Sequence, residues 1–206
     1  MAWVNLNRWI THLEKNGELM KISEPVDVEL QAGAIADRLV KTNGPAVLFE
    51  KPRLPSGEIS EIPLAMNLFG SHDRTLRALG AAHSKEVGER LVALMKPDIG
   101  GIVKRPWTGL PLLRDAISMP PKKVRKGSCQ RVRMDNDVTK LPIPKTWPTD
   151  GGRYITLPLV VTKDPNSGEH NLGMYRGQVF GPKEVGLHWQ IHKHGADHAA
   201  AWPDGK

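Results

Sequence analysis

Residues 154–179, YITLPLVVTKDPNSGEHNLGMYRGQV, decide how the second half of this 206-residue chain folds. Apolar side chains alternate strictly along the first half of the stretch, as on a half-buried strand, although Pro158 restricts that strand to a sheet edge or a bulge. Asp164–Gly168 has the composition of a turn, because proline fixes one φ while asparagine and glycine tolerate left-handed backbone. We therefore expect Tyr154–Thr162 and Asn171–Val179 to pair as an antiparallel hairpin.

Helices and short strands alternate elsewhere in the chain, as judged from apolar spacing, capping residues and Gly or Asn stops. Four helices are expected: one from Asn5 to the stop at Asn16–Gly17, one over Glu29–Lys41, and two that begin after Ser71 and after Ser84. The expected strands lie at Glu18–Ile22, Ala46–Phe49, Pro63–Met66 and Glu184–Gln190. This pattern predicts an α+β chain. Residues 1–118 would form an α/β region with a proline-rich connecting segment, and residues 119–206 a β region.

Composition narrows the classes of function. The formal charge of +7 and the basic stretch Lys122–Lys126, followed by Arg131 and Arg133, favour an anionic partner. A solvated loop is the simplest interpretation of that stretch, and a phosphate-bearing cofactor is the more specific one. Nucleic acid is not expected, because no helix-turn-helix pattern, zinc-finger spacing or aromatic-laced RNA motif accompanies the charge.

Other features point to a protein of the cytoplasm. Cys129 is the only cysteine, so no intrachain disulfide can form, and we assign this residue no role. Every apolar run is interrupted before it reaches the length of a bilayer span. The first residues lack the basic start and apolar core of a secretory signal.

Half of the eight histidines lie close together near the end of the chain. His188 and His192 are four residues apart, as are His194 and His198, so each pair could share a helical face and bind a metal. No glutamate stands between them as in a hydrolytic zinc motif. Spacing alone therefore favours a polar, solvated helix start over a metal site.

Two blocks carry a family resemblance. Asn171–Arg176 (NLGMYR), then a spacer, then Trp189-x-x-His192 with a basic residue and Gly195, resembles the cofactor-binding core of the UbiD family of prenylated-FMN-dependent decarboxylases, represented by 3-polyprenyl-4-hydroxybenzoate decarboxylase. Weaker agreements extend along the chain, at Gly17–Leu19, Asn67–Ser71 and Leu141–Pro144.

The resemblance implies a fold and a set of binding residues. The β region would be the first, incomplete part of a split β-barrel related to flavin reductases, holding prenylated FMN and a divalent metal, usually Mn²⁺, with K⁺ as a further ion. Asn171, through its amide oxygen, and His192 would bind the metal, an oxygen- and nitrogen-rich ligand set that suits manganese. The implied cofactor-binding residues are Met174, Tyr175, Arg176, His188, Trp189, Gln190, Lys193 and His194.

Arg176 would be the catalytic residue. A guanidinium can hold a substrate carboxylate through two hydrogen bonds and can tune neighbouring acids, whereas the ordinary alternative is a surface ion pair. In a regular strand Asn171 and Arg176 would point to opposite faces. If both reach one cofactor the strand must bend, and Gly173 is the expected place.

The implied activity is non-oxidative decarboxylation of an aromatic or unsaturated acid, in which the modified flavin adds across the substrate double bond and a glutamic acid protonates the product. The first candidate substrate is 4-hydroxy-3-polyprenylbenzoate in ubiquinone biosynthesis. Another phenolic or heteroaromatic acid is the alternative, because His188 and Lys193 stand where ubiquinone-pathway members tend to carry arginine, and His194 where glycine is common.

The resemblance also implies partners. They are a small aromatic carboxylic acid, a flavin prenyltransferase that supplies the cofactor, further copies of the full-length chain in a homo-oligomer, and the membrane surface through a polyprenyl substrate. The third metal ligand and the proton donor would lie beyond residue 206, so we expect no turnover from these residues alone. A non-catalytic flavin- or metal-binding fragment is the remaining alternative.

Overall fold

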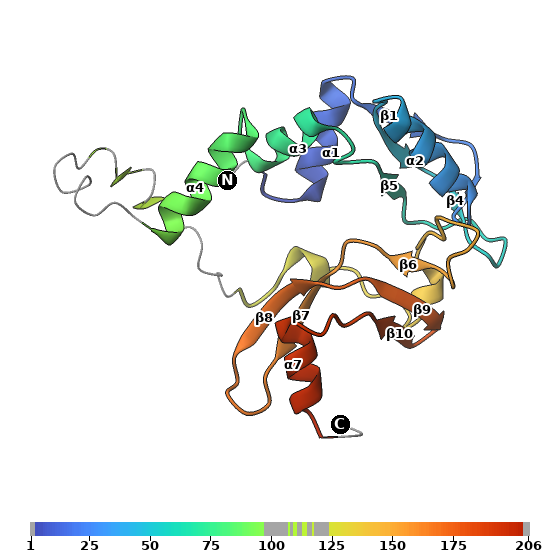
Figure 1. Cartoon of the computed structure of the whole chain (residues 1–206). Coiled ribbons are helices and arrows are strands. Elements are labelled where there is room, and N and C mark those ends of the chain that lie inside the picture. The colour runs from blue at the N-terminus through green and yellow to red at the C-terminus, as the bar shows by residue number, and fades with distance from the viewer. Residues whose placement is uncertain are drawn as a thin grey trace. The chain divides into compact units, whose positions relative to one another are not determined.

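The computed structural model of the chain describes residues 3–96 and 124–203, together with residues 107, 109, 110, 113, 114 and 117. Most of the expected proline-rich connecting segment lies outside these residues, as do Lys122, Lys123 and the side chain of Cys129. Helices and strands are mixed along the chain, so the α+β class is confirmed (Figure 1). The chain forms two compact units, one of Met1–Lys15 with Phe69–Arg133 and one of Asn16–Leu68 with Met134–Lys206.

The first unit is helical. It contains α1 (Leu6–Lys15), α3 (His72–Leu79), α4 (Ser84–Met95) and a short 3-10 turn, η1 (Ser128–Gln130). Asn5 and Ser71 cap their helices as predicted, because each side-chain oxygen accepts the backbone N–H three residues on, at 3.0 and 3.2 Å. The predicted cap at Ser84 is wrong by one residue: Ser84 is the first helical residue, and His83 precedes it without a side-chain capping bond.

Aromatic stacking organises the start of this unit. Trp9 is 2% exposed and lies 4.9 Å from the Trp3 ring, edge to face, and 6.1 Å from the Phe69 ring, nearly parallel. The Trp3 indole N–H donates to the carbonyl of Arg77 at 3.1 Å. α4 buries none of its residues.

The second unit opens with two small sheets and one helix. Its elements there are β1 (Leu19–Ile22), β2 (Val26–Asp27), α2 (Gln31–Lys41), β3 (Ala46–Phe49), β4 (Pro52–Arg53) and β5 (Leu64–Met66). The first sheet has the order β1-β3-β5, with β1 parallel and β5 antiparallel to β3, while β2 and β4 pair in parallel. Val26, Ala32, Val47 and Phe49, drawn from α2 and both sheets, form the buried core.

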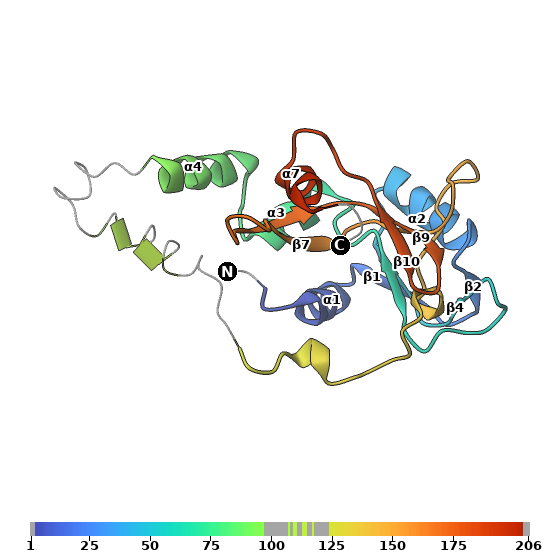
Figure 2. The ribbon, with the colours of Figure 1, turned by 90° about the horizontal axis from the view of Figure 1, so that it is seen from below.

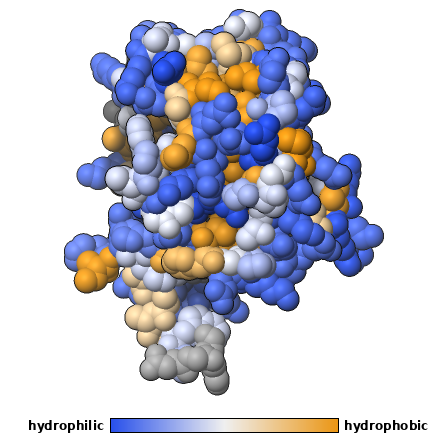
Figure 3. All heavy atoms as spheres, turned by 90° about the vertical axis from the view of Figure 1, so that its right-hand side faces the viewer, coloured by the Kyte–Doolittle hydropathy of each residue, from blue (hydrophilic) through white to orange (hydrophobic). Residues whose placement is uncertain are grey.

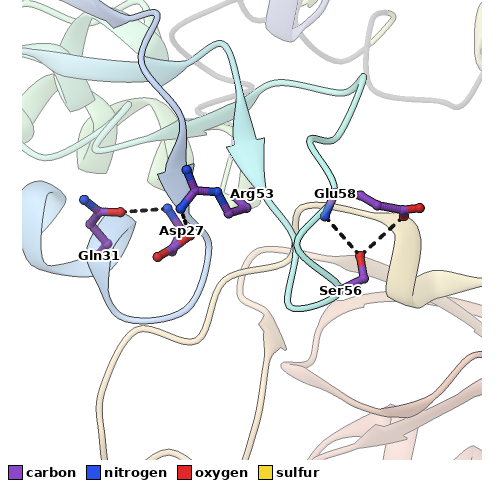
Figure 4. Close-up of polar contacts among 5 residues, drawn as sticks. All are labelled: Asp27, Gln31, Arg53, Ser56 and Glu58. Atoms are coloured by element: carbon purple, nitrogen blue, oxygen red, sulfur yellow. Dashed lines mark hydrogen bonds and ion pairs between the residues drawn. The ribbon is translucent and has the colours of Figure 1, made fainter.

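Polar contacts fix the β2–β4 pair to the start of α2. Arg53 donates to Asp27 Oδ1 at 3.1 Å, and the Asp27 N–H donates to Gln31 Oε1 at 2.8 Å (Figure 4). In the loop after β4, Ser56 Oγ accepts the backbone N–H of Glu58 at 3.4 Å. Each strand of the pair is two residues long, so these bonds supply constraints that the short ladder lacks.

The segment around Lys145 is hydrogen-bonded to residues 28–30 and so joins this part of the unit to the strands that follow. Lys145 donates its N–H to the carbonyl of Val28 at 3.1 Å, and its carbonyl accepts the N–H of Leu30 at 2.8 Å. The second bond holds Leu30 at φ +64°, a left-handed conformation that costs a leucine free energy. A Cβ on Gly33 would lie 2.9 Å from the Thr146 carbonyl oxygen, so glycine is needed for this approach.

The β region contains a short turn, η2 (Val138–Lys140), five strands and one helix. They are β6 (Tyr154–Ile155), β7 (Leu159–Lys163), β8 (His170–Met174), β9 (Gly177–Gly181), β10 (Glu184–Leu187) and α7 (His194–Ala201). β7 and β8 form one antiparallel hairpin, and β10-β9-β6 form a separate antiparallel sheet. α7 packs against the hairpin (Figure 1, Figure 2).

The predicted hairpin is confirmed in its turn and central pairing and is wrong in its length. Each expected long strand is interrupted, the first around Pro158 and the second at Tyr175–Arg176, so the outer segments pair with each other as β6 and β9. The bend falls after Met174 rather than at Gly173, and the Tyr175 ring that follows the bend is buried. The third strand ends at Leu187 and not at Gln190.

The turn between β7 and β8 has the expected chemistry. Asp164 Oδ1 accepts the N–H of Asn166 at 2.7 Å and that of Ser167 at 3.2 Å. These hydrogen bonds, that of Asn166 first, hold the pKa of the Asp164 carboxyl below its ordinary value. Gly168 completes the turn at φ +75°.

Large apolar side chains remain exposed on one face of the hairpin. They are Leu159, Val161, Leu172 and Met174, each more than half exposed. Apolar side chains also reach the surface on the face of the molecule drawn in Figure 3. None of the helices in the described residues combines the length and the apolar character of a membrane span.

Candidate functional site

Tyr175 is the centre at which the two motif blocks meet. Its side chain is 4% exposed, and its ring lies 4.8 Å from the Trp189 ring, edge to face. The Tyr175 hydroxyl accepts the backbone N–H of Gly195, in the first turn of α7, at 2.9 Å. Asn171 Nδ2 donates to the same hydroxyl at 3.4 Å. One buried ring therefore joins β8, the segment after β10 and the start of α7.

Two glycines make room for this ring. A Cβ on Gly195 would lie 2.5 Å from Tyr175 Oη, 2.6 Å from its Cζ and 2.7 Å from Trp189 Cζ3. A Cβ on Gly173 would also collide with the Tyr175 ring, since it would lie 2.9 Å from Cζ. The Tyr175 ring is therefore packed inside the protein and is held there by close contacts.

Asn171 belongs to a polar network that sequence reasoning missed. Thr162 lies directly opposite Asn171 in the β7–β8 register, and its Oγ1 accepts from Asn171 Nδ2 at 3.4 Å. The same hydroxyl is 3.0 Å from Nδ1 of His198, which is 8% exposed. Two signals in the sequence could have indicated this network. Counting back from the hairpin turn places Thr162 opposite Asn171, and His198 follows His194 by four residues.

The amide oxygen of Asn171 is the free acceptor of this network. Both hydrogen bonds of the side chain use Nδ2, and no group among the described residues bonds to Oδ1. An amide oxygen fixed by its own nitrogen is a suitable ligand for a hard divalent cation.

Arg176 lies on the other side of the bend. Its guanidinium carbon is 4.2 Å from the centre of the Tyr154 ring, a cation–π contact. Tyr154 is held in turn by its hydroxyl, which donates to Gln178 Oε1 at 2.8 Å on the neighbouring strand. No acidic side chain in the described part of the chain pairs with Arg176, so the surface ion pair considered above does not form among those residues. The guanidinium N–H groups remain available to an anion.

The remaining predicted residues differ in their surroundings. Lys193 precedes α7 and holds its ammonium 5.7 Å from the centre of the Tyr175 ring, while its N–H donates to the carbonyl of Gln190 at 3.0 Å. The N–H of His188 donates to the carbonyl of Arg176 at 3.2 Å, which joins the two blocks a second time. Met174 lies on the outward face of the hairpin, 53% exposed.

The histidines are not arranged as two helical pairs. His188 follows β10 and His192 lies in a turn, so these two do not share a helical face. His194 and His198 do lie on α7, where His194 is exposed and His198 is buried. Among the residues that the structure describes, no three His, Cys, Asp or Glu side chains gather as a metal site.

A cavity of about 410 Å³ adjoins the Tyr175 centre. Its walls combine two indole rings with the polar network, through Thr162, Trp189, His198 and Trp202. The Trp202 indole N–H donates to the carbonyl of Lys163 at 3.3 Å, which fixes one wall. An aromatic wall beside hydrogen-bonding groups is the usual character of a small-molecule site.

Comparison with known proteins identifies the family. Residues 10–95 match the family model described as 3-octaprenyl-4-hydroxybenzoate carboxy-lyase N-terminal domain, and residues 122–206 match the one described as the Rift-related domain of the same carboxy-lyase. An uncharacterized protein of Archaeoglobus fulgidus is 43% identical over 96% of this chain and 40% of its own length.

Solved structures show the same fold. The vanillic acid decarboxylase of Sedimentibacter hydroxybenzoicus in its closed form matches with a TM-score of 0.73 at 24% identity, over 95% of this chain and 39% of that chain. An evolved dimeric form of the UbiD-class enzyme HmfF from Pelotomaculum thermopropionicum, in complex with prFMN, matches with a TM-score of 0.69 at 22% identity, over 95% and 40%.

The 3,4-dihydroxybenzoic acid decarboxylase of Klebsiella pneumoniae matches with a TM-score of 0.70 at 20% identity, over 94% of this chain and 38% of that chain. The chain thus spans about two-fifths of the length of the relatives that it matches. With both of the family's domain models matched in order along its sequence, the chain belongs to the UbiD family.

Proposed function

We propose that this chain is part of a carboxy-lyase that removes the carboxylate from aromatic or unsaturated acids with the help of prenylated FMN and a divalent metal ion. The observation that carries the proposal is the meeting of the blocks Asn171–Arg176 and His188–Gly195 at the buried Tyr175 ring. These two blocks carry the resemblance to the family, and the fold brings them together from separate strands and a helix.

The metal-binding residues that we propose have the required chemistry. Asn171 keeps its amide oxygen available, and no side chain in the described ranges bonds to the imidazole of His192. An amide oxygen and an imidazole nitrogen suit Mn²⁺ and similar ions. The other ligands would come from the cofactor phosphate and from the rest of the full-length protein, with K⁺ as the second proposed ion.

The flavin-binding residues that we propose surround the same centre. Lys193, His188 and His194 bring positive charge or N–H donors for a phosphate, and Trp189, Gln190 and the backbone of Met174–Tyr175 supply the adjoining surface. When bound, prenylated FMN would supply the electron sink for the electron pair released with CO₂. The protein's own contribution is orientation and charge.

Arg176 is the residue that we propose binds the substrate carboxylate. Its guanidinium is held over Tyr154 without an acidic partner among the described residues, which leaves its N–H fork for an incoming anion. Two parallel hydrogen bonds from one planar group fix both the position and the plane of a carboxylate.

For the substrate, the family description favours 4-hydroxybenzoate with a polyprenyl chain, as in ubiquinone biosynthesis. The structural neighbours that act on vanillic and 3,4-dihydroxybenzoic acid support a simpler phenolic acid as the second candidate. A flavin prenyltransferase would supply the cofactor, the full-length protein would form a homo-oligomer, and a polyprenyl substrate would bring the protein to the membrane surface.

Two variants of the full-length protein separate the proposed roles. His192→Ala should lower the bound metal and the retained flavin, because an open metal shell loosens the grip on the cofactor phosphate. Arg176→Ala should keep much of the flavin and lose turnover. Flavin absorbance, metal content and decarboxylation rate measure the three quantities, and circular dichroism confirms folding. Near-normal turnover in Arg176→Ala, or full metal and flavin in His192→Ala, would show that the assigned roles are wrong.

A further inference from the structure

We propose that Thr162 and His198 are positioning residues that set the orientation of the Asn171 amide, so that its oxygen is presented to the metal ion. This inference rests on the proposed metal-binding role of Asn171. It concerns two residues outside the motif blocks, one on β7 and one on α7.

The three side chains form a continuous chain of hydrogen bonds across three elements. His198 Nδ1 is 3.0 Å from Thr162 Oγ1, which is 3.4 Å from Asn171 Nδ2. The cross-strand register holds Thr162 opposite Asn171, and the packing of α7 on the hairpin holds His198 against Thr162. His198 is 8% exposed, so packing holds its imidazole in place beside the threonine.

The chain has a direction because a threonine hydroxyl carries one proton. In the His198 tautomer that carries its proton on Nε2, Nδ1 is the acceptor, so Thr162 donates its proton to Nδ1 and only lone pairs of Oγ1 remain to face the amide. The side chain of Asn171 must then turn Nδ2 toward Thr162. The Tyr175 hydroxyl, which already accepts from Gly195, provides the second acceptor for Nδ2.

The consequence is a fixed position for the amide oxygen. Without His198 as acceptor, the Thr162 proton could be donated to Asn171 Oδ1, and the amide could rotate by half a turn. The oxygen would then be used inside the protein instead of being available to a cation. His198 therefore acts on the metal site through Thr162, in the way that outer partners orient metal ligands elsewhere.

The test uses Mn²⁺ binding by the full-length protein, followed by the loss of the free-ion electron paramagnetic resonance signal and independent of turnover. Thr162→Val and His198→Leu should each weaken Mn²⁺ binding by about 10- to 100-fold, the usual effect of losing such a partner. Thr162→Ser keeps the hydroxyl and His198→Asn keeps an acceptor near the place of Nδ1, so both should retain affinity close to that of the wild type.

Thr75→Val is the matched control, because it removes a threonine hydroxyl that bonds only to backbone carbonyls in the first unit. It should leave Mn²⁺ binding unchanged. Equal Mn²⁺ affinity in folded Thr162→Val or His198→Leu and in the wild type would overturn the inference, as would equal weakening in Thr75→Val. Failure of the wild type itself to bind Mn²⁺ would instead refute the proposed metal site.

Discussion

Gly195→Ala tests whether the Tyr175 ring is wedged as tightly as the contacts indicate. The new methyl group would lie 2.5–2.7 Å from Tyr175 Oη, Tyr175 Cζ and Trp189 Cζ3, closer than carbon atoms pack. The ring is 4% exposed, so protein atoms surround it on nearly every side. Overpacking of this kind costs about 1–3 kcal/mol. Displacing the hydroxyl would also weaken its 2.9 Å bond to the Gly195 N–H, a bond worth about 1 kcal/mol.

Glycine-to-alanine changes in helices otherwise stabilise, by up to about 1 kcal/mol, so the sign of the effect is informative. Gly88→Ala in α4 is the matched control, since the Cβ it would add has no atom within 4 Å apart from its chain neighbours and the backbone of its own helix. Urea unfolding, followed by circular dichroism and tryptophan fluorescence, should show Gly195→Ala less stable and Gly88→Ala at least as stable as the wild type. A Gly195→Ala protein with unchanged or increased stability would refute the wedged arrangement.

Three further changes have defined outcomes. Asp164→Asn keeps the acceptor for the Asn166 N–H but loses the charge. Because that bond lowers the folded-state pKa of Asp164, the wild type should be more stable than the variant above pH about 4. The urea midpoints of the two proteins should converge as the pH falls through the folded-state pKa. Ser71→Ala removes the cap of α3 and should cost about 1 kcal/mol, measured by the same unfolding assay. Tyr154→Ala should raise KM, because the Arg176 guanidinium would lose the ring that holds it in place. Tyr154→Phe keeps the ring and should leave KM unchanged.

Local signals predicted the local structure well. The caps at Asn5 and Ser71 and the turn at Asp164–Gly168 depend on residues a few positions apart, and the structure contains all three. The apolar alternation before the turn predicted a strand but not its interruption around Pro158. Alternation reports which face is buried and carries no information about which strand is the partner, so the β6–β9 pairing could not be predicted from it.

Only the site residues that lie inside the two motif blocks, Asn171–Arg176 and His188–Gly195, could be predicted from the sequence. The binding of the flavin by Tyr175 stays a prediction, while the role of its side chain as a buried link between β8 and α7 could not be predicted from the blocks. Thr162 and His198 lie outside both blocks, and their contact needs the strand register and the packing of a helix, which are long-range properties. The bend was predicted at Gly173 because a glycine inside a strand often marks a bend or a bulge. In the structure this glycine instead makes room for the neighbouring Tyr175 ring.

Release of CO₂ by the full-length protein, reconstituted with prenylated FMN and Mn²⁺, is the most direct test of the proposed activity. The candidate substrates are 4-hydroxybenzoate with a polyprenyl chain, vanillic acid and 3,4-dihydroxybenzoic acid. We expect one of them to be decarboxylated, and Arg176→Lys to lose most of that activity while it retains flavin absorbance, because an ammonium cannot form the two parallel hydrogen bonds of a guanidinium. Undiminished CO₂ release by Arg176→Lys, or none from any aromatic or unsaturated acid by the loaded wild type, would contradict the proposal.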